Sequence, residues 1–552
     1  MALLLDIYGL LSVIVHGLLL TAQSLTLGGI AFLALVAQPL AADLGEAGAR
    51  TVARCRRLLR WSAAAVILVV AVNVAAESLV LADTVDISLA ESATAAFALA
   101  GYAQIVAAAL ILLLLLSSRA SARAGRAGLG LAGLALLAAA TATSHAVAQL
   151  DNRAVLSVCT ALHRLCAGSW IGGIPYFLIA LAVCRSQGQW RRIGKRFSLL
   201  SMASVSAIAV TGVVMSLFYI GSLEALYGTA YGVMVITKSL LFLGLLGLGA
   251  MNFRVVERLR VDPAAPVLRL RRFAEVEVGV GIAVLFIAAS ITSLPPAVYL
   301  TNDRVTLADY AQRLSPRWPS FSTPAQASLA LAQLQGQLDA EAAQGAPAVS
   351  AYVPGAGQPP PRNAANIAWS EYNHHWAGAF VLIMALLALA DRNGTTRLGR
   401  SWPLLFAPFA AFLAYRDLVE GGLEDDIGFF ALLRDPEIVQ HLFFYALMAA
   451  FGIFEWGVRA GRLQAPRAAL VFPLLTATAA AALLTHSHSI ANVKDLLLME
   501  VTHVPLALLG ITFGWARWLE LRLVPAEGAI AGQVWRVCFV LVGILLVLYR
   551  EI

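Results

Sequence analysis

Long apolar stretches separated by short polar segments dominate this chain of 552 residues. Only 13% of its residues are charged, whereas soluble domains carry roughly 25%. Because a membrane-spanning helix needs about 20 mostly apolar residues, we predict an all-α, polytopic membrane helix bundle with about 14 transmembrane helices in two units. The predicted spans lie near residues 9–37, 61–82, 92–116, 128–149, 155–183, 197–220, 231–252, 273–294, 369–390, 402–415, 437–458, 468–486, 500–518 and 532–549.

The positive charges predict the orientation of this bundle. Most Lys and Arg residues fall in alternate loops, and such an excess marks the cytoplasmic side. Both termini should therefore lie on the opposite side. Since membrane insertion explains the basic segments, we expect the lipid bilayer as a partner and no nucleic acid. The basic segments are residues 50–60, 119–126, 185–196, 254–272, 392–400, 459–467 and 517–536.

The loops on the other side are acidic, as in the segment that holds Asp83, Asp86 and Glu91. Two interpretations stay open. Either these carboxylates concentrate cations at the outer surface, or they are simply what the positive-inside bias leaves outside.

The membrane pattern is interrupted between residues 295 and 368. This stretch opens with Pro295 and Pro296 and is rich in Ala, Gln and Pro, although residues 325–343 have helical periodicity. We therefore predict three parts, which are an eight-span membrane domain (1–294), a periplasmic connector (295–368) and a six-span, histidine-rich membrane domain (369–552).

All nine histidines lie at, or within the outer half of, predicted spans, and all fall on the same predicted side. Ionisable or ligating side chains are costly in a bilayer, so each is a functional candidate. Nine on one side predict an extracytoplasmic transition-metal site. They are His16, His145, His163, His374, His375, His441, His486, His488 and His503.

In the first half, His145 ends one predicted span and His163 begins the next. Cys159, His163 and Cys166 share one helix face at spacings of four and three residues. Imidazole and sulfur together suit copper, Cu(I) or Cu(II), better than Mg²⁺ or Ca²⁺, and His16 would add a third imidazole. The alternative is a hydrogen-bonded packing histidine flanked by small apolar cysteines.

In the second half, six histidines open or close four predicted spans. Imidazole, carboxylate and thioether groups are all present, and Met499 would favour Cu(I). The alternative is a set of interfacial histidines at helix ends. The candidate ligands are His374, His375, His441, His486, His488, Met499, Glu500 and His503.

Among the charged residues inside predicted spans, three are further candidates, which are Lys238, Glu77 and Glu277. Lys238 either pairs with an acid such as Glu77 or extends to the membrane surface. Glu277 lies near the start of the eighth span, where a carboxylate interacts favourably with the helix N-terminus.

Three strings in the first half point to a known family. They are HRLCAGSWIGGI, which follows His145 and begins at His163, YGVMVITKSLLFLGLLGLGAMN around Lys238, and FAEVEVGVGIAVLFIAASITSLPP around Glu277. They resemble the CopD-type copper resistance proteins of bacterial inner membranes, over about residues 1–300. The second half resembles longer proteobacterial members. The resemblance implies copper uptake from periplasm to cytoplasm, with roles for His16, His145 and His163 first and for Lys238 and Glu277 second.

Two further functions stay open. Facing histidines on two helices are also typical of a haem-binding membrane cytochrome. A non-transporting factor that delivers copper to a periplasmic copper-binding protein would use the same outer ligands. Outer imidazoles alone specify no reaction, so we expect no enzyme activity.

Overall fold

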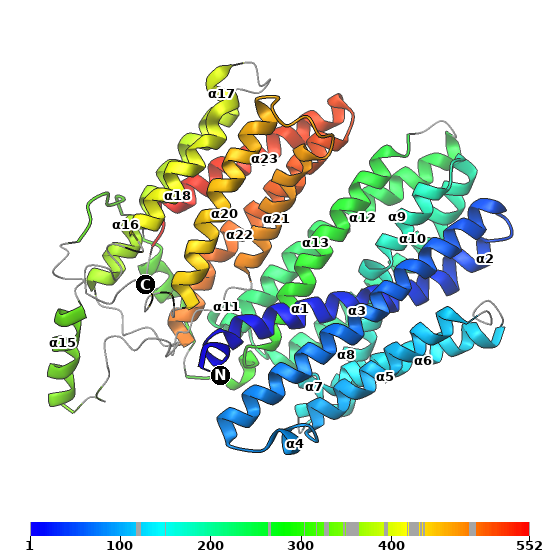
Figure 1. Ribbon diagram of the computed structural model, residues 1–552, viewed down its shortest axis with the longest axis horizontal. Coiled ribbons are helices and arrows are strands. Elements are labelled where there is room, and N and C mark those ends of the chain that lie inside the picture. The colour runs from blue at the N-terminus through cyan, green and yellow to red at the C-terminus, as the bar shows by residue number, and fades with distance from the viewer. Residues whose placement is uncertain are drawn as a thin grey trace. The chain divides into compact units, whose positions relative to one another are not determined.

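The computed structural model describes residues 2–117, 123–149, 151–262, 266–302, 304–315, 317–324, 331–345, 364–390, 396–416, 436–484 and 493–550, with the single positions 348, 418, 430 and 433. Throughout these residues the secondary structure is helical, and no strand occurs (Figure 1). The predicted all-α fold is therefore confirmed.

Among the described helices, 11 are long and apolar enough to cross a membrane. They include all eight predicted spans of the first half. Three predicted spans of the second half coincide with the helices α18 (Phe406–Tyr415), α21 (Val471–Leu483) and α22 (Val493–Arg522), which are not among the 11. The membrane class is confirmed, and the total of about 14 stays a prediction.

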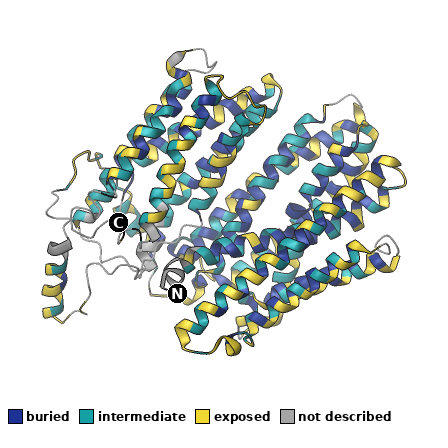
Figure 2. Cartoon of the chain, in the orientation of Figure 1, coloured by how far each residue is buried: buried dark blue, intermediate teal, exposed yellow. Residues whose placement is uncertain are grey.

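Exposed and buried residues alternate along these helices (Figure 2), and many of the exposed ones are large and apolar. On α5 (Ala96–Leu116), Val106, Leu110 and Leu113 are exposed, whereas Ala108 and Ile111 are buried. Exposed leucine and valine at a helical spacing form a surface suited to hydrocarbon. The helix thus has a protein-facing side rich in small residues and a side that suits lipid.

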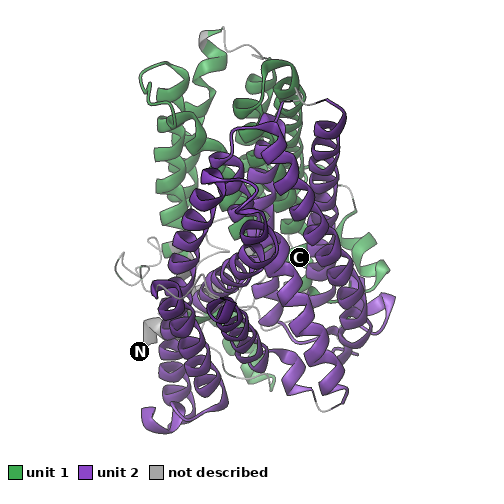
Figure 3. Cartoon of the chain, turned by 90° about the vertical axis from the view of Figure 1, so that its right-hand side faces the viewer, with its two compact units in different colours: residues 1–10, 228–230, 303–552 green, residues 11–227, 231–302 purple. Residues whose placement is uncertain are grey.

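The chain divides into two compact units (Figure 3). Unit 2 comprises residues 11–227 and 231–302, and unit 1 comprises residues 1–10, 228–230 and 303–552. The predicted domain boundaries at 294/295 and 368/369 stay a prediction.

Unit 2 consists of helices throughout its described residues. It contains most of α1 (Ala2–Phe32), η1 (Leu33–Ala37), α2 (Gln38–Leu40), α3 (Glu46–Val85), α4 (Leu89–Ser92), α5, α6 (Arg123–Ala142), α7 (His145–Ala148), α8 (Arg153–Ala167), η3 (Gly168–Gly172), α9 (Ile174–Val183), α10 (Gln187–Tyr219), α11 (Leu223–Gly228), α12 (Ala230–Val261), α13 (Leu268–Thr292) and η4 (Ala297–Tyr299).

Successive long helices of unit 2 run in opposite directions, so their C-terminal ends gather at two opposite ends of the unit. The C-terminal ends of α2, α5, α9 and α12 lie at one end of the unit, and those of α3, α6 and α10 lie at the other (Figure 1). The arrangement keeps the basic segments 50–60, 185–196 and 254–272 at one end, as a single cytoplasmic side requires.

A close crossing of α1 and η3 joins the helices that carry the first histidines. A Cβ atom added to Gly172 would overlap the carbonyl oxygen of Ser24, and one added to Gly28 would overlap the Gly172 backbone. Only glycine permits such backbone proximity. η3 is a π-helical turn, a feature often found at functional sites. The SWIGG string is therefore a packing motif that holds α1 against the helix carrying His163.

Unit 1 has a core rich in aromatic side chains. The rings of Phe451 and Phe472 stack with centroids 4.7 Å apart, and those of Phe513 and Trp535 stack at 5.3 Å. Trp402 is buried with them. Its further elements are α14 (Leu307–Arg313), α15 (Leu331–Ala343), α16 (Ala364–Ala390), α17 (Arg397–Ser401), η6 (Trp402–Leu405), α18, α20 (Pro436–Arg459), η9 (Ala468–Leu470), α21, α22 and α23 (Pro525–Val547). The helix α15 lies within the stretch whose periodicity predicted one.

Candidate metal site

His16 brings a buried nitrogen without a partner into unit 2. The Nε2 atom of His16 is buried and has no hydrogen-bond partner among the residues that the structure describes. The residue lies within electrostatic reach of Arg164 and His145. Because a buried polar atom is normally satisfied, an unpartnered imidazole nitrogen points to something that binds there. His16 therefore fits the role of a ligand.

The hydrogen bonding of His145 leaves one of its nitrogens free to bind a ligand. Nε2 of His145 lies 2.8 Å from the carbonyl oxygen of Thr292, at the end of α13. A carbonyl oxygen only accepts, so Nε2 carries the proton. The lone pair of the neutral ring therefore lies on Nδ1, which is the state that a metal ligand needs.

His163 is oriented in a similar way by a hydroxyl group. Its Nδ1 lies 3.0 Å from Oγ1 of Thr211 on α10, and that hydroxyl donates its own proton to the carbonyl oxygen of Ala207 at 2.7 Å. Nδ1–H of His163 is consequently the donor, and the lone pair lies on Nε2. A Cβ atom at Gly212 would lie 3.8 Å from Cε1 of His163, in ordinary contact.

Two cations accompany these imidazoles. Arg164 donates a hydrogen bond to the carbonyl oxygen of Ala140 and acts electrostatically on His16, His163 and Lys238. Within the described residues, no ion pair joins Lys238 to Glu77, whose carboxylate hydrogen-bonds with Asn73. A metal here would lie near fixed positive charge, so a monovalent ion is repelled less than a divalent one.

The cysteines of α8 do not extend this group into a larger cluster. Cys159 and Cys166 are free thiols, each partly buried. Across the described ranges, no group of three or more His, Cys, Asp or Glu side chains is arranged to hold a metal ion. Electrostatic interactions thus link His16 with His145, and His163 with Arg164 and Lys238.

Unit 1 gathers two of its histidines around one tyrosine. The His374 ring stacks on Tyr549 with centroids 3.7 Å apart, and the His503 ring meets Tyr549 edge-on at 6.0 Å. Nδ1 of His374 donates to the carbonyl oxygen of Ser370 at 2.9 Å. The two imidazoles therefore converge from α16 and α22, with the lone pair of His374 on Nε2.

His375 makes contacts that leave no nitrogen for a metal. Its Nδ1 lies 2.8 Å from the carbonyl oxygen of Ser320, and its Nε2 lies 3.1 Å from that of Tyr549. The side chain is only 2% exposed. Both nitrogens thus face acceptors, and the residue joins the segment before α15 to the chain end after α23.

The remaining predicted ligands are His441 and Glu500, which are described, and three residues of which the structure does not describe the side chains. The His441 ring contacts Tyr445 on its own helix, with centroids 6.0 Å apart. Oε2 of Glu500 is buried without a hydrogen-bond partner. His486, His488 and the side chain of Met499 lie outside the described residues.

Two residues near the unit 1 histidines had no place in the sequence-based site. Arg416 is buried, donates to Oδ1 of Asn373 at 3.1 Å and to Oγ1 of Thr323 at 3.0 Å, and lies over the Tyr372 ring. Tyr549 joins His374 and His503. In the sequence, Arg416 could be recognised only as a cation that directly follows the predicted span 402–415.

Comparison with known proteins bears on unit 2. Residues 191–291 match the family model described as Copper resistance protein D. This segment contains Thr211, Lys238 and Glu277, whereas His16, His145 and His163 lie before it.

A relative gives a second match. Copper transport protein CutJ of Bacillus subtilis (strain 168) is 33% identical over 161 residues, which cover 28% of this chain and 28% of that relative. No solved structure matches. The resemblance to CopD-type copper resistance proteins predicted from the sequence is confirmed for the part of unit 2 that the family model covers, residues 191–291, and the chain spans less than a third of the length of the curated relative that it matches.

Proposed function

We propose that this protein binds copper at the outer histidines of unit 2 and moves it across the bacterial inner membrane from periplasm to cytoplasm. The observation that carries the proposal is the buried, unpartnered Nε2 of His16 beside His145. The name of the CutJ relative and the family match support copper as the cargo.

The ligands that we assign are His16 and His145, which interact electrostatically, and His163 as a third imidazole that would have to approach them, since no group of three such side chains is arranged to hold a metal in the described residues. Thr292 and Thr211 direct the lone pairs of the second and third imidazoles to Nδ1 and Nε2, respectively. Partners of this kind orient metal-binding imidazoles in many proteins. Neutral imidazoles beside Arg164 and Lys238 favour Cu(I), because its single charge is repelled least.

The orientation follows from the charges. With the basic ends of unit 2 in the cytoplasm, His16 and His145 lie toward the periplasm, together with both termini. Copper would then enter from the periplasmic side, and a periplasmic copper-binding protein is the partner that this orientation suggests.

The test compares two triple variants of the full chain. H16A/H145A/H163A removes the unit 2 imidazoles, and H374A/H441A/H503A removes three from unit 1. After purification with copper, we expect the first variant to lose its metal and the second to keep most of it. Equal retention by the first variant and the wild type would overturn the assignment.

Two further measurements separate the other functions. A Soret band in the purified wild type would indicate a haem protein instead. Copper accumulation in vesicles distinguishes transport from delivery, since a delivery factor binds copper without raising the amount inside.

A further inference from the structure

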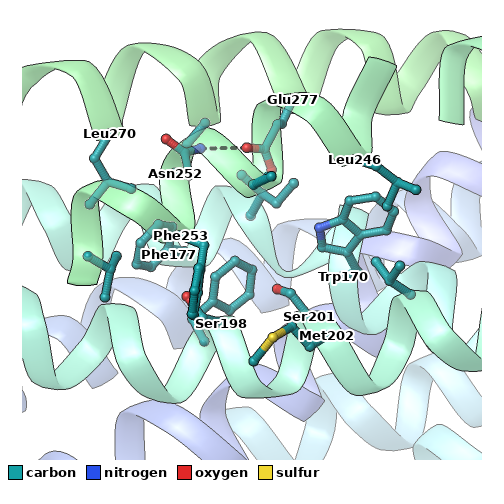
Figure 4. Close-up of a pocket in the computed structure, with 17 residues that line it drawn as sticks. Trp170, Phe177, Ser198, Ser201, Met202, Leu246, Asn252, Phe253, Leu270 and Glu277 are labelled. Atoms are coloured by element: carbon teal, nitrogen blue, oxygen red, sulfur yellow. Dashed lines mark hydrogen bonds between the residues drawn. The ribbon is translucent and has the colours of Figure 1, made fainter. Parts of the chain in front are cut away.

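A cavity of about 300 Å³ lies within unit 2. Its walls come from α9, α10, α12 and α13 with η3, and are mostly apolar and aromatic. Glu277 and Asn252 lie together on one wall, and Ser201 and Met202 face them from α10 (Figure 4). Nine residues separate Glu277 from the start of α13, which places it about 14 Å from the basic end of the unit.

Glu277 is the only ionisable residue among those that line the cavity. The contributions of α9, α10 and α12 are apolar, aromatic, hydroxyl, thioether and amide groups. The Glu277 side chain is 4% exposed, and its Oε1 accepts a hydrogen bond from Nδ2 of Asn252. A carboxylate inside a membrane protein is costly without a compensating positive charge. The cavity lining provides none.

Both sides of the cavity have buried polar atoms that lack a hydrogen-bond partner among the described residues. They are Oδ1 of Asn252, beside Glu277, and the hydroxyl oxygen Oγ of Ser201 on the facing helix α10. The cavity is large enough for several water molecules, and such water would satisfy these atoms. Water would also carry protons to and from the carboxyl group.

We propose that Glu277 is a proton-exchange site, which binds a proton from cavity water and releases it again. An O–H bond forms on a Glu277 carboxyl oxygen as one breaks in a hydronium ion, and no electron is transferred. A proton suits this site better than a metal ion. No group of three His, Cys, Asp or Glu side chains that could hold a metal occurs in the described part of the chain, and the cavity lining has no second such ligand.

Infrared difference spectroscopy of the purified full chain tests the site directly. Glu277→Gln keeps the size of the side chain and an oxygen that accepts from Asn252. The matched control is Glu275→Gln, two residues away, where the carboxylate is ion-paired with Arg272. We expect a protonated-carboxyl band that disappears as pH rises in the wild type and E275Q and is absent from E277Q. Identical spectra for the wild type and E277Q would overturn the proposal.

A second readout identifies the residue chemically. An apolar carbodiimide adds to protonated carboxyl groups, and mass spectrometry locates the adduct. We expect an adduct on Glu277 whose yield falls as pH rises, in the wild type and in E275Q. Adducts on other buried carboxyls such as Glu500, with none on Glu277 at any pH, would count against the site.

One consequence rests on the proposed function. If the protein moves copper, exchange at Glu277 would couple that movement to protons. In vesicles we expect copper uptake by the wild type to be accompanied by proton movement that E277Q lacks. An absence of copper uptake by the wild type would refute the transport function, whereas the infrared result decides the proton site by itself.

Discussion

His375 of unit 1 is used differently from the histidines of unit 2, although all come from the outer ends of predicted spans. In unit 2, each of His145 and His163 donates through one nitrogen and leaves a lone pair on the other, and Nε2 of His16 has no hydrogen-bond partner among the described residues. In unit 1, His374 shares the pattern of His145 and His163, whereas His375 faces a carbonyl oxygen with each nitrogen.

The difference teaches that position in the membrane does not decide the role of a histidine. Its hydrogen-bond partners do, because a ring whose two nitrogens face acceptors must give up one of these contacts before that nitrogen can bind a metal. Unit 2 therefore offers ligands, whereas His375 in unit 1 stabilises the fold.

The largest effect should follow from His16→Ala. Loss of a partner that only orients a ligand costs roughly 10- to 100-fold in metal affinity, so loss of the ligand should cost more than about 100-fold. Competition with a Cu(I) chelator measures the copper affinity of each variant. His375→Ala is the comparison variant and should leave the affinity unchanged. A larger loss of copper affinity in His375→Ala than in His16→Ala would contradict the roles that we assign to these two residues.

His375→Ala should instead destabilise unit 1. The substitution removes the imidazole that lies between the carbonyl oxygens of Ser320 and Tyr549, of which the second is buried, and we expect a loss of about 2 kcal/mol in the free energy of unfolding. Thermal unfolding followed by tryptophan fluorescence measures it, with His441→Ala as control. An unchanged midpoint would show that His375 does not hold these segments together.

Thr211→Val tests the orientation of His163 with a smaller change. Valine keeps the shape but cannot accept from Nδ1–H, and we expect copper affinity to fall about tenfold. The control is Thr237→Val, because this buried hydroxyl donates to Val233 of its own helix. An equal effect of both variants would mean that the loss is not specific to His163.

The smallest effect concerns the acidic outer loop. Hydrogen bonds from the side chain and backbone of Ser88 lower the pKa of Glu91, which caps α4. The charged form therefore stabilises the cap above the ordinary pKa of a glutamate, and this stabilisation is lost as pH falls through the lowered value. The protection of α4 amides, taken relative to the exchange rate of an unstructured chain at the same pH, should fall at low pH in the wild type and should lose this pH dependence in Glu91→Gln. Copper affinity should not change, and a clear drop would favour the cation-concentrating interpretation.

Much of the fold follows from local pattern. Apolar length predicted the eight spans of unit 2, because it depends on neighbouring residues alone. The role of His375 could not be predicted, since its partners lie 55 and 174 residues away in sequence. Likewise, nothing local distinguished His374, which stacks on Tyr549, from a solvent-facing histidine.

X-ray absorption spectroscopy of the copper-loaded full chain tests the central claim most directly, because imidazole ligands give a characteristic scattering pattern. The account predicts imidazole nitrogens around copper in the wild type and in H374A/H441A/H503A, and their loss in H16A/H145A/H163A. Unchanged imidazole coordination in H16A/H145A/H163A would contradict it.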